Sequence, residues 1–165
     1  MGLGTTAASA ETIEDVEELA INVSGRIIEH CAIGEIRDMD FGDITRKNLR
    51  AKTRAHLSCN LPFEMTIRSA NGGLAHESMP KGQGPYAGTL SYTLGVDMAV
   101  RRPQRGLVSR RFQSAQLMGG QSFTSEGGIA TDGMAVSVSL NPPSADAGLL
   151  AGKYGETIEI SIAPI

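Results

Sequence analysis

The sequence lacks features that two large classes of protein need. No apolar run approaches the roughly 18–20 residues of a membrane-spanning helix. There is no basic excess of the kind typical of nucleic-acid-binding domains, because the formal net charge is -3 at pH 7. We therefore expect neither insertion into a membrane nor binding to nucleic acid.

The residue sets that support catalysis or metal binding are also missing. The histidines His30, His56 and His76 show no HExxH spacing, and no CxxC or Cys/His pattern suited to zinc is present. The glycine-rich stretches 82–88 and 119–128 lack the Gly-Lys-Ser/Thr ending of a phosphate-binding loop, and there is no GxSxG motif. We expect a protein that is not an enzyme and that has no catalytic residues, no metal and no cofactor.

What is present favours a single domain rich in β-structure. The chain has 165 residues, of which 41% are hydrophobic, 20% charged and 4% aromatic, and it contains 20 glycines. This length is enough for one domain that buries most of its apolar surface. Abundant glycine, serine and threonine, with no long helical period, predicts an all-β chain with many turns.

Period-two alternation is the strongest signal. Apolar and polar residues alternate in six segments, at 19–27, 49–59, 63–67, 90–98, 134–140 and 158–162. In the second segment Arg50, Lys52 and Arg54 share one face, so a one-residue slip would bury several positive charges and the register is fixed. Glycine and proline separate the segments. The pattern predicts an immunoglobulin-like antiparallel β-sandwich.

Two segments depart from the alternation. Residues 1–18 combine small residues with an acidic cluster and predict a flexible N-terminal extension ahead of a domain that spans residues 19–165. Residues 101–132 show little periodicity and predict a surface excursion, with a short edge strand around residues 112–118. This excursion is either a solvated loop or a contact for an anion or a partner. The arginines that would make such a contact are Arg101, Arg102, Arg105, Arg110 and Arg111.

The only two cysteines lie on the apolar faces of predicted strands. We expect a disulfide between Cys31 and Cys59, with two buried free thiols or one reactive thiol as the alternatives. A bridge across 28 residue steps would stabilise the fold by about 3–4 kcal/mol in the chain-entropy model. It would also indicate an oxidising compartment, such as the periplasm or the cell exterior.

The order of several short motifs resembles a known family. The run from Ile21 to Cys31 is followed by Met39-Asp40-Phe41-Gly42 and then by the second cysteine. Leu90-Ser91-Tyr92 comes later, and Ala151-Gly152-Lys153-Tyr154 precedes the last apolar strand. In this order, over residues 19–163, the motifs resemble the spore coat protein U domain family, which includes the pilin subunits of archaic chaperone–usher fimbriae.

The resemblance implies a structural subunit whose sandwich has six strands and lacks a seventh. A periplasmic chaperone would lend a strand to the open groove, and an outer-membrane usher would replace it with the N-terminal segment of a neighbouring subunit. Repetition would build a secreted fimbrium on the cell surface that supports adhesion or biofilm formation. The resemblance also implies a disulfide between the two cysteines.

In this interpretation the first and last strands border the groove. The expected groove residues are Leu19, Ile21, Val23, Ile27, Tyr154, Ile158, Ile160 and Ile162. Segment 1–18 is the candidate donor strand, with Ile13 and Val16 as its apolar residues. The alternative is a secreted binding module that completes its sandwich with its own residues 1–18 or 101–132, and whose arginines contact an anionic ligand.

Overall fold

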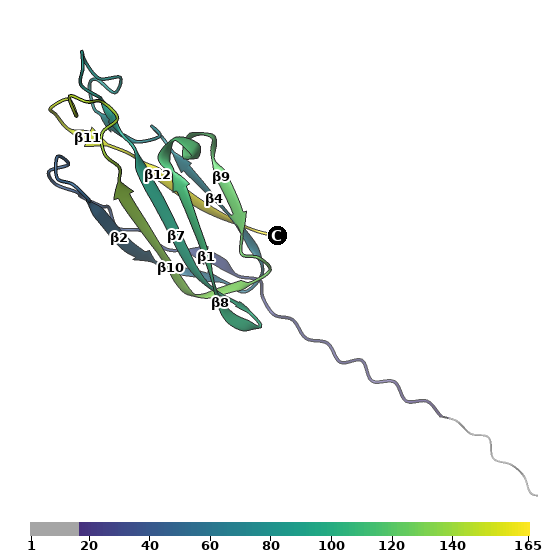
Figure 1. Cartoon of the computed structure of the whole chain (residues 1–165). Helices are drawn as coiled ribbons and strands as arrows, with labels where there is room; N and C mark the ends of the chain where they lie inside the picture. Colours follow the sequence, from purple (N-terminus) through teal and green to yellow (C-terminus); the bar gives the residue numbers. More distant parts are fainter. Residues whose placement is uncertain (1–16) are drawn as a thin grey trace, which may run out of the picture.

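The structure, a computed structural model, describes residues 17–165 and is built from antiparallel β-sheets with one short 3-10 helix (Figure 1). The largest sheet has the strand order β1–β3–β10–β7–β8, and β2 pairs with the same side of β10 as β3 does. Its strands are β1 (Cys31–Ile33), β2 (Arg50–Ala55), β3 (Leu57–Cys59), β7 (Tyr92–Arg102), β8 (Gln104–Gln113) and β10 (Ile129–Leu140).

Two smaller sheets complete the body. The first has the order β12–β4–β9, with β12 at one edge. Its strands are β4 (Phe63–Ser69), β9 (Gln121–Thr124) and β12 (Ile158–Pro164). The second joins β5 (Leu74–His76) to β6 (Thr89–Leu90) and to β11 (Tyr154–Gly155). The helix η1 (Ser114–Gly119) links β8 to β9.

The core lies between the largest sheet and the β12–β4–β9 sheet, because the alternating apolar side chains of both point to the same interior. The most fully buried of these side chains include Leu57, Phe63, Met65, Ile67, Leu94, Val96 and Met98. The predicted all-β antiparallel fold is therefore confirmed, and the arrangement is that of a β-sandwich.

The prediction of a first strand over residues 19–27 is wrong. Residues 17–30 form no strand and all of them are exposed. Figure 1 shows this segment leaving the sheets and running away from the body. The folded body therefore starts at Cys31 and not at residue 19. Period-two alternation identifies a segment that can form a strand with one apolar face. It does not show what that face packs against.

The predicted surface excursion over residues 101–132 is also wrong. The strand β7 continues to Arg102 and turns directly into β8, with Arg101 paired to Arg105 at the end of the hairpin. The chain then forms η1 and β9 before β10 begins at Ile129. The period-two pattern was missed here because an arginine stands on the apolar face of β8. Arg110 lies on the same face as Val108 and Phe112, at the edge of the sandwich where burial is only partial.

Cys31 and Cys59 form the predicted disulfide. The two residues face each other in the ladder between β1 and β3. The strand β1 has only three residues, and β3 is its single strand partner in the part of the chain that the structure describes. The covalent bond therefore fixes a strand that has few hydrogen bonds of its own.

Replacing both cysteines by alanine should lower the free energy of unfolding by about 3–4 kcal/mol, because the unfolded chain regains the entropy of a closed loop; the loop spans 28 residue steps. Denaturant unfolding of the oxidised wild type and of the double variant measures the difference. A loss below about 1 kcal/mol would mean that the β1–β3 ladder holds the strand without help.

Candidate functional site

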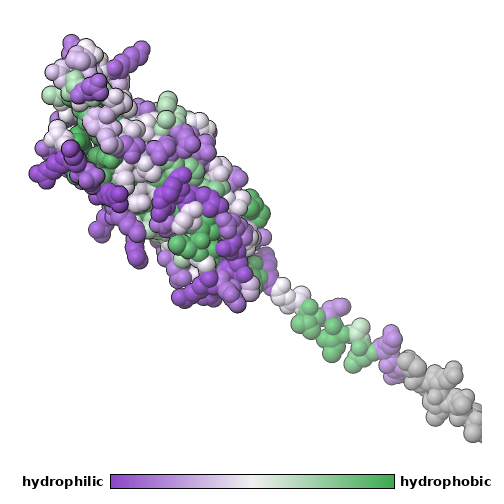
Figure 2. All heavy atoms as spheres, in the orientation of Figure 1, coloured by the Kyte–Doolittle hydropathy of each residue, from purple (hydrophilic) through white to green (hydrophobic). Residues whose placement is uncertain are grey.

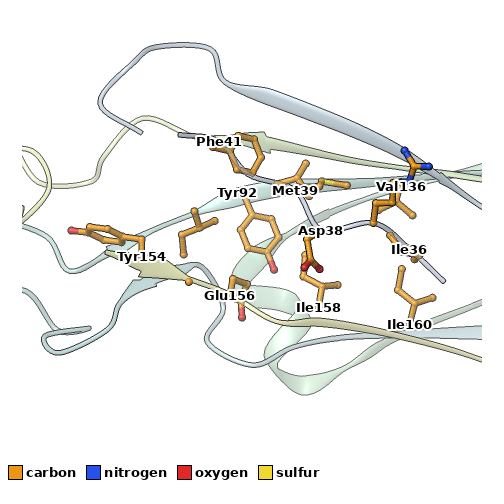
Figure 3. A pocket seen from close by; sticks show the side chains of 14 residues that line it. Ile36, Asp38, Met39, Phe41, Tyr92, Val136, Tyr154, Glu156, Ile158 and Ile160 are labelled. Atoms are coloured by element: carbon orange, nitrogen blue, oxygen red, sulfur yellow. The ribbon is translucent and has the colours of Figure 1, made fainter. Parts of the chain in front are cut away.

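A groove with a volume of about 460 Å³ opens between β12 and the segment 36–41 (Figure 3). Most of its lining is apolar. The apolar residues are Ile36, Met39 and Phe41 from the segment, Ile158 and Ile160 from β12, Leu74 from β5, and Tyr92, Val136 and Val138 from the core strands. Both sheets contribute to the lining, so the groove exposes part of the core at one side of the sandwich.

The apolar face of β12 is only partly covered. Ile158, Ile160 and Ile162 pack against the core, yet each of them stays partly exposed. The residues paired with them on β4 are Ser69, Ile67 and Met65, and these are at most 5% exposed. The core is thus complete under β4 and incomplete under β12, one strand further out.

The outer main-chain edge of β12 is also free. Ala70 N donates to Thr157 O, and Ile165 N donates to Pro62 O, so the odd-numbered residues of this segment turn their polar groups toward β4. Successive residues of an antiparallel strand point these groups to opposite sides. The N–H and C=O groups of Ile158, Ile160 and Ile162 therefore point away from β4. No strand among residues 17–165 pairs with that edge.

Glu156 fixes the start of β12. Its carboxylate accepts hydrogen bonds from Ser69 Oγ at 2.7 Å, Gly73 N at 3.0 Å and Asn71 N at 3.1 Å. The β4–β5 turn thereby holds the chain just before the strand. Tyr154 lies beside it, donates its hydroxyl to Leu150 O and contacts the His76 ring edge to face. These contacts define one end of the groove.

Tyr92 brings an unsatisfied polar atom to the groove floor. Its side chain is fully buried, and its hydroxyl has no hydrogen-bond partner among the described residues. The nearby Ser69 and Glu156 are bonded to each other. Burial raises the pKa of Tyr92 to about 12, so the hydroxyl keeps its proton. Figure 3 shows this hydroxyl pointing between Asp38 and Glu156. A buried donor without an acceptor is costly.

The segment of residues 17–30, called the tail below, carries apolar side chains that no residue of the described chain covers. Leu19 is 89% exposed, Ile21 77%, Val23 90% and Ile27 86%. Figure 2 shows these side chains as a green stretch beyond the body. The four residues share one parity, so in an extended conformation they lie on one face, while Asn22, Ser24 and Arg26 lie on the other. The tail therefore has an exposed apolar face, although it forms no strand in the structure.

Asn60 holds the base of the tail in line with β1. Its side chain accepts a hydrogen bond from His30 N at 2.8 Å and donates one to Ile28 O at 2.9 Å. Its main-chain N–H donates to His30 O at 2.9 Å. These three bonds continue the β1–β3 ladder past Cys59 and keep residues 28–30 extended where they leave the body.

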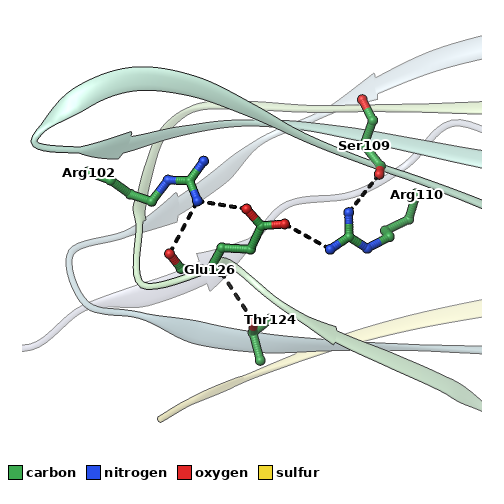
Figure 4. Close-up of polar contacts among 5 residues, drawn as sticks. All are labelled: Arg102, Ser109, Arg110, Thr124 and Glu126. Carbon is green, nitrogen blue, oxygen red and sulfur yellow. Dashed lines mark hydrogen bonds and ion pairs between the residues drawn. The ribbon is translucent and has the colours of Figure 1, made fainter.

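Side chains close the opposite side of the sandwich, between β8 and β9. Glu126 binds Arg102 at 2.7 Å and Arg110 at 2.8 Å (Figure 4). Arg110 also lies over the Phe123 ring at 5.7 Å, and Phe123 packs against Phe112. We call the three ion-paired residues the clasp. Because of this closure, the β12 side is where the core is left open.

The structure divides the expected site residues. Tyr154, Ile158 and Ile160 line the groove, and Ile162 follows on the same face of β12. The expected border residues Leu19, Ile21, Val23 and Ile27 lie on the tail and do not line it. Ile13 and Val16 fall outside the described residues.

The groove residues of segment 36–41 were missed, because their spacing follows no regular period. The one available signal was the short motif that contains Met39 and Phe41.

The five arginines do not form one patch. Arg102 and Arg110 belong to the clasp, and Arg111 pairs with Asp97 at 3.1 Å on the outer face of the large sheet. Arg101 and Arg105 are exposed at the end of the β7–β8 hairpin and make no ion pair within residues 17–165.

Comparisons with protein-family models, curated proteins and solved structures found no match. Among residues 17–165 no group of His, Cys, Asp or Glu side chains is arranged to hold a metal ion. In the same residues no helix is both long and apolar enough to cross a membrane. The site is an apolar groove beside an edge of β12 with which no strand among residues 17–165 pairs.

Acid should weaken the clasp. Hydrogen bonds from Arg110 and Arg102 lower the pKa of Glu126 below its ordinary value of about 4.3. A carboxyl with a lower pKa in the folded than in the unfolded chain stabilises the fold above its unfolded pKa. That stabilisation is lost as the pH falls through the folded pKa. Glu126→Gln should therefore lower the melting temperature more at pH 7 than near pH 2.5.

Thermal unfolding at both pH values tests this expectation. The control is Glu159→Gln, which alters an exposed carboxylate on β12 that makes no ion pair in the described chain. Equal effects of Glu126→Gln at both pH values would contradict the ionic origin of the clasp.

Proposed function

We propose that this chain is a structural subunit of a bacterial surface fibre, in which the tail of one copy fills the groove of the next. The observation that carries the proposal is that one molecule has both an exposed apolar segment and an apolar groove that such a segment could fill. The tail is an exposed segment with one apolar face, and the groove is apolar core surface beside an edge of β12 that no described strand covers. The motif order that resembles the spore coat protein U domain family supports the same function.

The side chains of the tail match the space in the groove. A cavity of about 150 Å³ holds one benzene-sized group, so a groove of about 460 Å³ accommodates roughly three such groups. Leu19, Ile21, Val23 and Ile27 point to one side of an extended tail. Full burial of each side chain contributes about 1.5–3 kcal/mol to the binding free energy. Joining two chains costs about 4–15 kcal/mol in lost freedom of motion. Most of the face must therefore insert for the junction to be stable.

The backbone of the tail would complete the hydrogen bonding. A strand laid along β12 meets the outward N–H and C=O groups of Ile158, Ile160 and Ile162, which is strand addition at a free edge. Insertion would thus cover the apolar surface of the groove and give the outward main-chain groups of β12 hydrogen-bond partners.

The geometry at Asn60 favours exchange between copies over self-insertion. A tail that folded back into its own groove would need a tight turn at residues 28–30. Asn60 holds those residues extended and in line with β1 through three hydrogen bonds. The alternative function, a secreted binding module completed by its own residues 1–18 or 101–132, would break these bonds only by turning the chain at residues 28–30.

We further propose a periplasmic chaperone and an outer-membrane usher as partners before assembly. A free strand edge beside an apolar groove promotes aggregation unless another strand covers it, so a newly folded subunit needs a temporary occupant. The Cys31–Cys59 bridge is compatible with a secreted chain that folds in an oxidising compartment and reaches a fimbrium on the cell surface.

Arginine at the groove-facing positions of the tail should prevent assembly. The variant Ile21→Arg/Val23→Arg places guanidinium groups where apolar pockets would receive them, and burying an unpaired charge is costly. The fold of the body should be unchanged, since both residues are exposed outside it. Sedimentation velocity should show polymers for the wild type and monomers for the variant.

The matched control is Asn22→Arg/Ser24→Arg, which adds the same charge to the opposite face and should still assemble. Equal loss of assembly in both variants would contradict strand insertion. A peptide of residues 17–30 should also stabilise the Ile21→Arg/Val23→Arg variant, by about 2.7 kcal/mol at one hundred times the dissociation constant. A peptide with arginine at positions 21 and 23 should not.

Asn60→Ala should shift the chain from polymers toward closed monomers, because residues 28–30 become free to turn back. Sedimentation velocity over a dilution series measures the monomer fraction. Protection of tail amides from hydrogen exchange in that fraction would show that the groove is filled from within. The control is Asn71→Ala, since Asn71 makes its hydrogen bond to Glu156 through the main chain. An unchanged monomer fraction would contradict this role of Asn60.

A further inference from the structure

The outer face of the largest sheet, on the side away from the core, is hollowed. A depression of about 360 Å³ lies across β2, β10, β7 and β8, and Arg50 and Arg111 contribute to its lining from opposite sides. Ser137, Ser139 and Thr93 lie between the two arginines. We call this depression the trough. It shares no lining residue with the groove beside β12.

Strand register explains the shape of the trough, which has short side chains at its centre and long ones at its two rims. One row across the sheet runs from Arg50 through Ser139 and Thr93 to Gln113. The next row runs from Lys52 through Ser137 and Gly95 to Arg111. Long side chains on β2 and β8 thus flank short ones on β10 and β7. The rims are about 14 Å apart, because three strand spacings separate them.

Arg111 is held in a defined position on its rim. A Cβ atom at Gly95 would lie 2.9 Å from the Arg111 Cζ and 2.5 Å from Ser137 Oγ, so glycine lets the guanidinium lie close to the sheet. Arg111 Nη1 donates to Asp97 Oδ1 at 3.1 Å and to Arg110 O at 3.0 Å, and Nη2 donates to Asp97 Oδ2 at 3.5 Å. A guanidinium has five N–H donors, so two remain for a ligand.

The strand β2 contributes Arg50 to the lining, and Lys52 and Arg54 continue a regular row of positive charge along β2 outside it. Arg50, Lys52 and Arg54 alternate along β2, are all exposed and point to the outer face. Their side chains repeat about every 6.6 Å along the strand. A third row runs from Arg54 through Ala135 and Asp97 to Ser109. The three rows together carry four cations, which are Arg50, Lys52, Arg54 and Arg111, and one carboxylate, Asp97, so their net charge is +3. The whole chain has a net charge of -3.

The floor offers neutral groups that both donate and accept hydrogen bonds. Ser137, Ser139 and Thr93 present hydroxyls. At one end Asn141 links Thr93, Ser91 and Gln113 in a hydrogen-bonded network. Hydroxyl and amide groups of this kind complement the hydroxyls of a sugar ring, and guanidinium groups prefer planar carboxylates.

We propose that the trough binds a carboxylated polysaccharide, with the carboxylates on the cationic rims and the sugar hydroxyls on the floor. The regular spacing along β2 fits a repeating polymer better than a single anion. Nucleic-acid bases would find no aromatic side chain to stack on in the lining. A peptide would find no free strand edge at the floor, because β10 and β7 are paired on both sides.

Binding of the full chain to immobilised polygalacturonate at 0.15 M salt tests the proposal. Arg50→Gln/Arg111→Gln should weaken binding at least about tenfold, because two charge-assisted contacts are lost. Arg101→Gln/Arg105→Gln removes the same charge from the end of the hairpin and should change affinity less than about twofold. Arg50→Gln alone alters an exposed side chain outside the ion pairs, and it should give a smaller loss with an unchanged melting temperature.

Three competitors identify the class of ligand. Neutral dextran tests whether charge is needed, poly-L-glutamate supplies carboxylates without sugar hydroxyls, and double-stranded DNA supplies phosphates. The proposal expects weaker binding to all three than to polygalacturonate. It is overturned by equal binding to any competitor, by equal losses in the two double variants, or by no binding to polygalacturonate. Because the trough lies apart from the groove, these outcomes do not depend on how copies assemble.

Discussion

A strand at the edge of a sandwich must turn one row of N–H and C=O groups outward, and at β12 that row lies beside apolar surface instead of open water. The odd-numbered residues are paired with β4, while Ile158, Ile160 and Ile162 point their main-chain groups into the groove region. The same three side chains are only partly covered. Backbone pairing and apolar burial are therefore incomplete at the same place, and one added strand would remedy both.

The two sides of the sandwich differ in how the core between the sheets is covered. Between β8 and β9 the chain uses its own side chains, with Glu126 joining two arginines and an aromatic pair beneath them. Among residues 17–165 no ion pair or aromatic pair joins β12 to segment 36–41. The groove therefore exposes apolar core surface of a kind that side chains cover between β8 and β9.

Alternation made much of the fold predictable. It located the cores of β2, β4, β7, β10 and β12, because side chains on these strands face a core within the same chain. It failed at residues 19–27, whose pattern is equally regular, because periodicity describes the face of a strand and not its partner. It also failed between residues 101 and 124, where Arg110 occupies a core-side position at the rim and covers Phe123.

The candidate site was predictable only in part, for a related reason. The isoleucines of β12 lie on a regular strand, so their shared face could be read from the sequence. Met39, Phe41 and the floor residue Tyr92 come together through the path of an irregular segment and the stacking of two sheets. Such contacts depend on tertiary packing, which local pattern does not contain.

The bridge between Cys31 and Cys59 has a mechanical consequence in the proposed fibre. Tension along such a fibre would enter each subunit through residues 28–30 and reach β1, which has only three residues. Hydrogen bonds in so short a ladder would peel apart one after another under load. The covalent link carries the load from β1 to β3, and β3 continues the strand that lies along β10. Force would then pass to β10, the longest strand among residues 17–165, so the weakest element of the subunit need not limit the strength of the filament.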